Sequence, residues 1–532
     1  MAFAIPDIPE SERTPTVLLL LNLLHQQQEH IATLEDEIAR LKGLKPRPVI
    51  KPSTLETSAP QPPLPGQKRP GSDKRPKNSQ LVIARDVVVR LPDPPAGAVF
   101  KGYEDYVVQE LVLYAEAVRY RRERWQLPDG TSRLAPLPPE VLPGDHFGPT
   151  LQSFVLDQHY DQRVTQPLLL TQLRQLGIDL SAGQLNNLLT RDQETFHQEK
   201  EELLPTGLKV SSYVGVDDTG ARHQGHNGSC LHIGNDLFAY FHSSDSKSRL
   251  NFLETLRRPH TDYVVNDIAQ AYWTSQELSA AMGEALVDGP RLFADAAAWQ
   301  SHLTAAGVAS VRGVRIATEG ALLGSLIEHG VSPALVVLSD GAPQFDILVH
   351  ASCWLHAERP LARMVPFGEA HRQAIEGVRG RIWELYQELK AYREKPNPAQ
   401  KAGLEARFDA LCAWATGYPS VDAVLKEIRS HKADLLRVLD RPEVPLHNNV
   451  SESHIREYVT RRKISGGTRS ESGRRCRDTF TSLKKTCSCL GVNFWEYLQD
   501  RVRGLGLIPR LKDLIRIRAG ETPAGKVMAA SA

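Results

Sequence analysis

Two apolar runs that end at an aspartate constrain the fold of this chain more than any other feature. The run from Val210 to Val216 leads to Asp217, and the run PALVVLSD ends at Asp340. Short runs rich in valine and bounded by polar residues predict buried strands. Alternation along a strand puts Asp217 on one face and Asp218 on the other. We therefore expect an α/β fold in which a carboxylate follows each of two strands.

A third acid, Glu452, stands near the start of a stretch crowded with basic residues. This stretch, HNNVSESHIREYVTRRKISGGTRSESGRRCR, predicts a helix over the residues after Glu452 and a turn at Gly466-Gly467. Most charge runs are only solvated faces. Here the cations follow an acid suited to a metal site, which favours contact with the phosphates of DNA. The predicted DNA-binding residues in this stretch are Arg456, Arg461, Arg462, Lys463 and Arg469.

Three carboxylates suit a site for two Mg²⁺ or Mn²⁺ ions. These hard cations prefer oxygen ligands and leave positions for water and phosphate oxygens. Two such ions activate the attacking oxygen and stabilise the leaving oxygen in phosphoryl transfer. We therefore predict that Asp217, Asp340 and Glu452 are the metal ligands and catalytic residues of a site that holds two ions. A single aspartate after a strand is often only a helix cap, which is the alternative for each of these residues. Helix capping accounts less well for three acids in a basic context.

The second acid has a competitor, because the run DYVVND ends at Asp267. Asp267 follows directly after the helix expected over residues 246–256, which is the simplest chain order. Asp340 ends a stronger apolar run and precedes HASCWLHAER, a candidate neighbouring strand, so we favour Asp340. With this choice the Ala-rich residues 268–330 form a helical insertion. Amphipathic helices over residues 360–445 form a second insertion.

The N-terminal part predicts three further segments. Residues 16–43 carry a heptad pattern with one polar interruption at Gln27, which favours a parallel coiled coil and a homodimer or larger homo-oligomer. A single surface helix is the alternative. We assign residues 1–44 to this helix and 45–80 to a disordered basic linker, which is either a spacer or a tether for phosphates. Residues 81–148 are assigned to a small β-rich module broken by prolines.

Residues 149–205 predict helices of which the last two form a helix-turn-helix. Thr165 and Ser181 are candidate N-caps on either side of the turn GIDL. Such units either bind DNA or only pack against the rest of a protein. If this one binds DNA, the contacts come from Gln184, Asn186 or Asn187 of the second helix. The catalytic domain then covers residues 206–515, and residues 516–532 form a disordered tail.

Composition excludes several classes of protein. The chain has six cysteines and no Cys-x-x-Cys pair, which argues against a zinc ribbon and a disulfide framework. No apolar run approaches the roughly 20 residues of a membrane span, and acidic residues precede the first apolar stretch, unlike a signal peptide. We expect a cytoplasmic protein without a membrane partner. No phosphate-binding GxxxxGK[ST] motif and no serine nucleophile at motif spacing occur.

Five motifs carry a family resemblance: DDTG at Asp217, SDGAPQF at Asp340, CWLHAER from Cys353, NNVSESHIREYVTRRKISGGTRSESG from Asn448 and KTCSCLGVNFWEYL from Lys485. With the N-terminal heptads, they make the chain resemble the DDE transposases of the insertion sequence 66 family over nearly its whole length. The resemblance implies a ribonuclease-H-like catalytic domain, to which the Asp-x-Thr pattern at Asp217 is also suited. It assigns the catalytic triad to Asp217, Asp340 and Glu452. Many relatives also carry a Cys-rich zinc-binding segment near the N-terminus, which this chain lacks.

The resemblance implies metal-dependent cleavage at transposon ends, followed by transfer of the freed 3′-hydroxyl into target DNA. The expected partner is double-stranded DNA, both transposon ends and target, and helper proteins encoded by the element are a further candidate. Recognition of the ends would fall to the helix-turn-helix, the β-rich module or the basic linker. A bacterial protein of this kind would lie in the cytoplasm, at the nucleoid when bound. Two alternatives remain: a metal-dependent nuclease that does not join DNA, and a non-catalytic DNA-binding protein derived from a transposase.

Overall fold

The computed structural model describes residues 27, 82–95, 97–138, 141 and 146–521. Apart from Gln27, the predicted coiled coil over residues 1–44 lies outside the described residues, as does the predicted linker over 45–80. The chain divides into two compact units, Met1–Leu113 and Tyr114–Ala532. Where the first unit is described from Val82 onward, its side chains are exposed and it contains neither helix nor strand.

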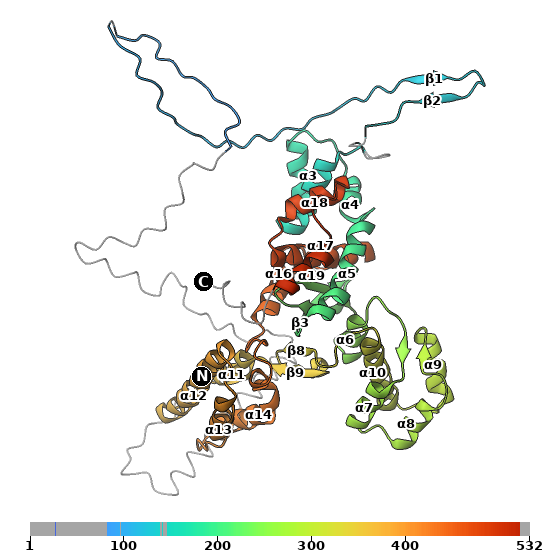
Figure 1. Cartoon of the computed structure of the whole chain (residues 1–532), viewed down its shortest axis with the longest axis vertical. Helices are drawn as coiled ribbons and strands as arrows, with labels where there is room; N and C mark the ends of the chain where they lie inside the picture. The colour runs from blue at the N-terminus through green and yellow to red at the C-terminus, as the bar shows by residue number, and fades with distance from the viewer. Residues whose placement is uncertain (1–26, 28–81, 96, 139–140, 142–145, 522–532) are drawn as a thin grey trace. The chain divides into compact units, whose positions relative to one another are not determined.

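The β-rich module expected over residues 81–148 contains less strand than its sequence indicates. Its described residues form one antiparallel hairpin, β1 (Arg124–Gln126) and β2 (Ser132–Leu134), visible in Figure 1. Prolines directly follow β2 in LAPLPPEVLP, and each proline removes a backbone donor that a sheet would need. The proline-free residues 97–123 are exposed and form no strand.

A five-stranded mixed sheet forms the centre of the second unit, in the order β5-β4-β3-β8-β9. Three strands make an antiparallel meander: β3 (Tyr213–His223), β4 (His226–Gly234) and β5 (Ala239–Ser244). β8 (Val336–Ser339) and β9 (Val349–Ser352) continue the sheet parallel to β3. This α/β arrangement is compatible with the ribonuclease-H-like fold that the sequence leads us to expect.

The two faces of β3 serve different cores. Val214 and Val216 lie in the large hydrophobic core together with leucines of α5 (Glu194–Val210). The opposite face packs under α16 (Asn449–Ser465), and its small core consists of Ala221, Cys230, Ala239, Phe241, Ile455 and Tyr458. Because side chains alternate along a strand, Asp217 lies on the same face as Ala221, toward α16.

Helix α17 (Glu471–Leu490) covers the edge of the sheet along β5. Three of its side chains accept hydrogen bonds from backbone amides of the strand: Asp478 from Ser243 at 2.7 Å, Ser482 from Phe241 at 2.9 Å and Thr486 from Ala239 at 3.1 Å. The acceptors are four residues apart on a helix, a rise of about 6 Å. The donors are two residues apart on a strand, a rise of about 6.6 Å. These repeats match, so the helix satisfies amides that an open edge would leave unpaired.

The helix-turn-helix region contains the expected helices. They are α2 (Pro149–Leu156), a π-helical turn (Asp157–Asp161), α3 (Gln166–Gln175) and α4 (Ala182–Thr190). Ser181 caps α4 as expected: its hydroxyl accepts from the Gln184 amide, and the Gln184 side chain accepts from the Ser181 amide. Thr165 precedes α3 but makes no side-chain cap bond.

The predicted domain boundary at residue 205 falls inside a helix. Helix α5 continues through Pro205 to Val210. Leu156, Leu173 and Leu189 share one core with residues of α17 and α18 (Phe494–Arg503). The helices therefore pack against the C-terminal helices: α2 lies against α18, and α4 lies against α17, as Figure 1 shows.

The first insertion lies between β5 and β8 and is mostly helical, as expected. It contains a short two-stranded sheet, β6 (Tyr263–Val264) with β7 (Leu292–Phe293). Its helices are α6 (Arg249–Leu256), α7 (Asp267–Ser275), α8 (Ala280–Val287), α9 (Ala296–Ala305) and α10 (Val311–Glu328).

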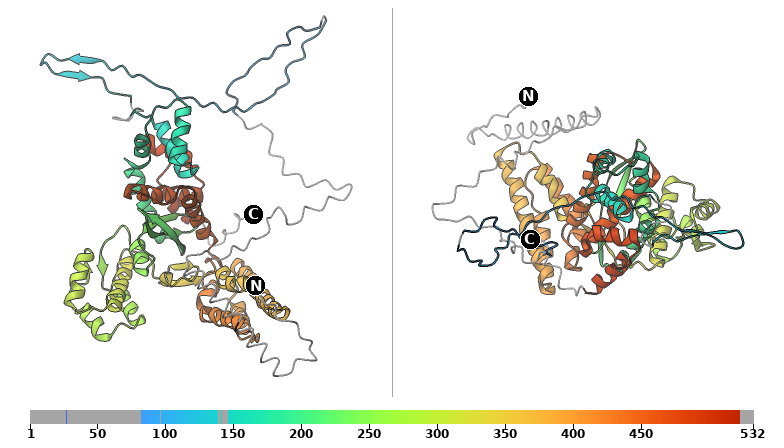
Figure 2. Two further views of the ribbon diagram at one scale, coloured as in Figure 1. Left: turned by 180° about the vertical axis from the view of Figure 1, so that it is seen from behind. Right: turned by 90° about the horizontal axis from the view of Figure 1, so that it is seen from above.

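The second insertion lies between β9 and α16. Its helices are α11 (Trp354–Arg363), α12 (Glu369–Glu394), α13 (Pro398–Cys412), α14 (Pro419–Ser430) and α15 (Lys432–Leu435), followed by a 3-10 turn (Arg437–Leu439). These helices bury a hydrophobic core of their own around Leu389 and Phe408. They lie side by side in both views of Figure 2.

Residues 516–521, which were expected to begin a disordered tail, belong to a helix. Helix α19 (Leu511–Glu521) buries Leu511 and Ile515 completely, and this anchors it against the large core. Residues 522–532 lie outside the described part. Among the described helices, none combines the length and the apolar composition needed to cross a membrane.

Candidate active site

The structure places the three predicted acids on adjoining elements. Asp217 lies on β3, Asp340 directly follows β8, and Glu452 lies in the first turn of α16. Burial, and after it the charge of Asp340, raise the pKa of the Asp217 carboxyl to about 7, with smaller contributions from Asp218 and Glu452. β8 pairs with β3, and α16 packs on β3, so the three acids lie in the same region of the fold.

Asp217 lies within its strand instead of at the end of it. β3 pairs with β8 only as far as Gly215 but continues beside β4 to His223. Asp217 therefore follows the parallel part of the strand, next to the point where β8 ends before Asp340. Asp340 is exposed, and its carboxylate accepts a hydrogen bond from the Ala342 amide at 3.1 Å.

The neighbouring acid Asp218 already has partners. Its carboxylate pairs with Lys247 and accepts a hydrogen bond from Gln344 at 3.0 Å. Asp217 has no cationic partner of this kind, and its Oδ1 accepts from the Asp218 amide at 2.7 Å. This difference supports Asp217 over Asp218 as the metal ligand.

Asp267, the competitor of Asp340, lies elsewhere. It is the first residue of α7, whose N-cap is Asn266, and it follows β6 of the small two-stranded sheet. β6 pairs with β7 and does not belong to the central sheet. Asp340, in contrast, follows β8, which pairs with β3, so the sheet order favours Asp340 over Asp267.

Asn448 and Gly215 set the position of the Glu452 helix on β3. Asn448 is buried, and its side-chain amide donates to the Val216 carbonyl at 2.7 Å. A Cβ at Gly215 would lie 2.5 Å from Ser451 Oγ and 2.6 Å from Asn448 Oδ1. The first turn of α16 therefore contacts the backbone of β3 two residues before Asp217.

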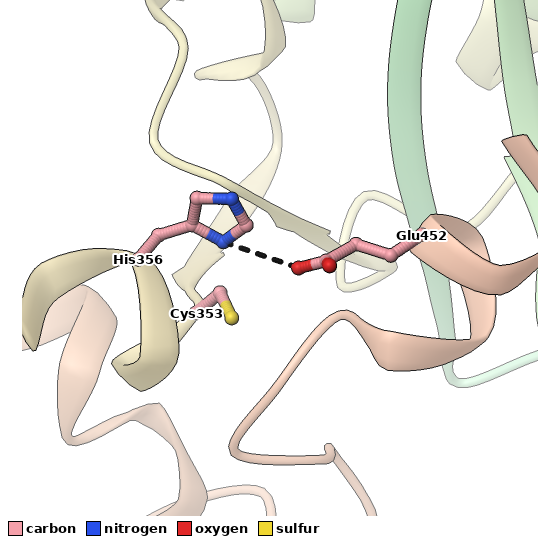
Figure 3. A group of neighbouring side chains, drawn as sticks. All are labelled: Cys353, His356 and Glu452. Atoms are coloured by element: carbon pink, nitrogen blue, oxygen red, sulfur yellow. Dashed lines mark ion pairs between the residues drawn. The ribbon is translucent and has the colours of Figure 1, made fainter. Parts of the chain in front are cut away.

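Cys353 and His356, which the site prediction did not include, lie against Glu452. Cys353 precedes α11, and His356 lies in the first turn of that helix. The Nδ1 atom of His356 is 3.5 Å from Glu452 Oε1, an ion pair that Figure 3 marks with a dashed line. An Arg359 nitrogen is 3.7 Å from the same oxygen. Burial and the charge of Arg359 lower the pKa of His356. The Cys-x-x-His spacing in CWLHAER was the signal that could have pointed to these residues.

The donor set fits divalent cations. Glu452 Oε1 and His356 Nδ1 are both buried and have no hydrogen-bond partner. Buried polar atoms normally have partners, so such a pair indicates a place for another ligand. The clustered carboxylates of Asp217, Asp340 and Glu452 supply the oxygen ligands that Mg²⁺ and Mn²⁺ prefer.

The basic residues predicted to contact DNA fall into two groups. Arg456, Lys463 and Arg469 are exposed. Arg462 is half-buried, and its guanidinium donates to the Gly220 carbonyl and, at 3.3 Å, to the Thr219 hydroxyl.

Arg461 does not fit the prediction of a DNA contact, because it is 6% exposed. Its guanidinium lies 4.8 Å above the ring of Tyr160 and donates to the Tyr160 carbonyl at 3.1 Å. Burial lowers the pKa of Arg461 to about 10. The side chain therefore joins α16 to the π-helical turn.

The loop after α16 is held by backbone bonds to the end of β3. The Thr468 amide donates to the Arg222 carbonyl at 2.9 Å, and the Gln224 amide donates to the Thr468 carbonyl at 2.8 Å. In the helix-turn-helix region, Gln184 is exposed but engaged in the cap of α4, and Asn187 is half-buried. A DNA contact by either residue stays a prediction.

Known proteins are similar to this chain in sequence. The family model described as "Transposase IS66 family" matches residues 339–475, a segment that contains both Asp340 and Glu452. The protein named "Uncharacterized protein y4jO" from Sinorhizobium fredii (strain NBRC 101917 / NGR234) is 40% identical over 303 residues, which cover 56% of this chain and 94% of that protein. No solved structure matches. The sequence motifs, the family match and this similarity together show that the chain belongs to the IS66 transposase family.

Proposed function

We propose that the protein is a DDE transposase that cleaves DNA strands at transposon ends and joins them to target DNA. The observation that carries this proposal is the placement of three acids that lie far apart in the sequence: Asp217 and Asp340 belong to or follow the paired strands β3 and β8, and Glu452 lies in the helix turn that Asn448 joins to β3. Membership of the IS66 transposase family and a central sheet compatible with a ribonuclease-H-like domain support the same reading.

In this proposal the three carboxylates bind two divalent ions and do not bind the substrate directly. When bound, Mg²⁺ or Mn²⁺ would activate the attacking oxygen and stabilise the leaving oxygen of an in-line displacement. Asn448 keeps Glu452 against β3, and the ion pair with Lys247 keeps Asp218 out of the ligand set. Water is the first nucleophile, and the freed 3′-hydroxyl is the second.

The exposed cations Arg456, Lys463 and Arg469 would hold the phosphates of the duplex, so that binding weakens as salt rises. Gln184 and Asn187 are proposed as further contacts. We also propose that the heptads of residues 16–43 pair two subunits, so that two transposon ends are held together. Helper proteins encoded by the element would complete the assembly in the bacterial cytoplasm.

The first prediction concerns the acids. Glu452→Gln and Asp340→Asn should each reduce Mg²⁺-dependent cleavage of a duplex carrying the element's end by at least about 100-fold, because loss of a ligand charge weakens metal binding. DNA binding, measured by fluorescence anisotropy, should survive in both variants. Asp267→Asn is the matched control and should cleave normally.

The outcomes separate the rival functions. Normal cleavage by Glu452→Gln would refute the site, and loss of cleavage in Asp267→Asn alone would move the second acid to α7. Pre-cut ends that the wild-type protein never joins to a second duplex would identify a nuclease. Binding without any nicking would identify a non-catalytic DNA-binding protein.

A further inference from the structure

We infer that Cys353, His356 and Glu452 form a binding site for a borderline or soft divalent cation such as Zn²⁺ or Co²⁺. One ligand atom from each residue lies within 4.8 Å of the other two. The inference rests on the proposed function in one respect, because Glu452 belongs to both ligand sets. It differs from that function in the chemistry of the ion: a thiolate and an imidazole select zinc-like metals, whereas carboxylates alone suit Mg²⁺.

The geometry of the three side chains approaches that of a tetrahedral site. Bonds of about 2.0–2.3 Å from zinc to nitrogen, oxygen and sulfur place neighbouring ligand atoms roughly 3.4–3.6 Å apart. His356 Nδ1 and Glu452 Oε1 are already 3.5 Å apart, and Figure 3 shows the Cys353 side chain near this pair. The sulfur of Cys353 therefore needs to approach by no more than about 1 Å.

The local sequence explains why two of the ligands point the same way. Cys353 is the N-cap of α11, and His356 lies three residues later in its first turn. Residues three apart share a face of a helix. Cys353 is 1% exposed, so its thiol is shielded from solvent.

The surroundings leave room for a fourth ligand. A cavity of about 110 Å³ is lined by Asp340, Cys353 and His356, together with residues of α14 and α15. This is the volume of a few water molecules at roughly 30 Å³ each. Water or the Asp340 carboxylate can therefore complete the coordination. The Arg359 guanidinium competes for Glu452, but its side chain is 37% exposed and can turn into solvent.

A cation here would join the two chain segments that border the second insertion. The insertion leaves the sheet at Cys353 and returns at Glu452. The Asn448 amide already donates to Cys353 Sγ at 3.3 Å, and the Trp354 amide donates to the Leu446 carbonyl at 3.0 Å. Ligation would add a bond across this junction, and it would release the thiol proton to solvent because the thiolate is the ligand.

The experiment uses the full-length protein and Co²⁺ as the probe. Cobalt bound to a thiolate shows a near-ultraviolet charge-transfer band, which Mg²⁺ sites of carboxylates do not give. We expect the wild type to bind one Co²⁺ per chain and to show this band. The band should be absent in Cys353→Ser. His356→Asn should weaken Co²⁺ binding by at least about tenfold. Cys412→Ser removes another buried cysteine of the same insertion and is the matched control, in which the band should persist.

Each result decides the inference separately from the proposed function. Asp217→Asn should abolish Mg²⁺-dependent cleavage and keep the cobalt band. A wild type that cleaves DNA but gives no band would overturn the soft-metal site alone. A band that persists in Cys353→Ser also overturns it. A cobalt band in a protein that never cleaves DNA would leave the site standing and reject the transposase activity. Zn²⁺ stoichiometry and circular dichroism of Cys353→Ser separate ligand loss from misfolding.

Discussion

At the scale of single residues, Gly215 and Asn448 do as much for the site as the acids themselves. The Asn448 side chain donates to the Val216 carbonyl, and the Asn448 backbone amide donates to Cys353 Sγ. This one residue therefore joins β3, the start of α11 and the start of α16. Gly215 is the residue that lets α16 come this close. The position of Glu452 therefore depends on the absence of a side chain at a neighbouring strand residue.

Gly215→Ala should displace the first turn of α16. The new Cβ would lie 2.5 Å from Ser451 Oγ, and overpacking of this kind costs about 1–3 kcal/mol. We expect lower stability in urea unfolding and slower cleavage at temperatures where the variant is folded.

Gly220→Ala on the same strand is the control. Its Cβ would meet only the end of the Arg462 side chain, at 3.3 Å, which can move aside. Equal losses of cleavage in the two variants would contradict the assigned role of Gly215.

At the scale of elements, the π-helical turn Asp157–Asp161 connects the helix-turn-helix region to the C-terminal helices. Tyr160 stacks on Phe480 of α17 at 4.2 Å between ring centroids, and its hydroxyl donates to the Leu189 carbonyl at 2.9 Å. Arg461 of α16 lies over the same ring. The turn therefore holds three helices together around one aromatic side chain.

This turn also contains an acid that weakens the fold at neutral pH. Burial, followed by the charge of Asp161, raises the pKa of Asp157 from 3.8 to about 6. The folded protein thus binds more protons than the unfolded chain between about pH 4 and 6, so stability falls as pH rises through this window. Asp157→Asn should raise stability above pH 6 by at most about 3 kcal/mol and change nothing at pH 4.

Thermal unfolding at several pH values tests this prediction. Asp179→Asn, in the exposed loop between α3 and α4, is the control and should follow the wild type. If Asp157→Asn kept the pH dependence of the wild type, the buried charge of Asp157 would not be its source.

The sequence predicted those elements well whose formation depends mainly on residues that are neighbours in the chain. The apolar runs before Asp217 and Asp340, and the helix that starts near Glu452, are all present. What failed depends on partners distant in sequence. The residues near Arg461 in the sequence do not predict that it is buried against Tyr160. The residues near His356 do not predict its contact with Glu452. Local rules predict a break at Pro205, yet α5 continues through it because the leucines on both sides of this proline are buried.

At the scale of the whole molecule, the second unit contains two large and separate hydrophobic cores. One joins the central sheet to the helices on one of its faces, and the other lies within the second insertion. The IS66 family match spans residues 339–475, a segment that contains the second insertion but not β3. The two cores therefore predict two cooperative units of unfolding.

Phe408→Ala tests this independence. Phe408 is completely buried in the insertion core, and its truncation should cost about 3–5 kcal/mol. Hydrogen exchange measured by mass spectrometry should accelerate in α12–α14 while β3–β5 stay protected. Phe480→Ala, equally buried in the large core, should give the reverse pattern. Acceleration of β3–β5 by Phe408→Ala would show one cooperative unit instead.

The ladder of hydrogen bonds between α17 and β5 has a consequence for assembly. A peptide strand from another molecule could join the sheet on this side only by displacing Asp478, Ser482 and Thr486 from three amides at once. Other copies of this chain therefore cannot use this flank for strand addition, and the sheet is protected there from polymerising.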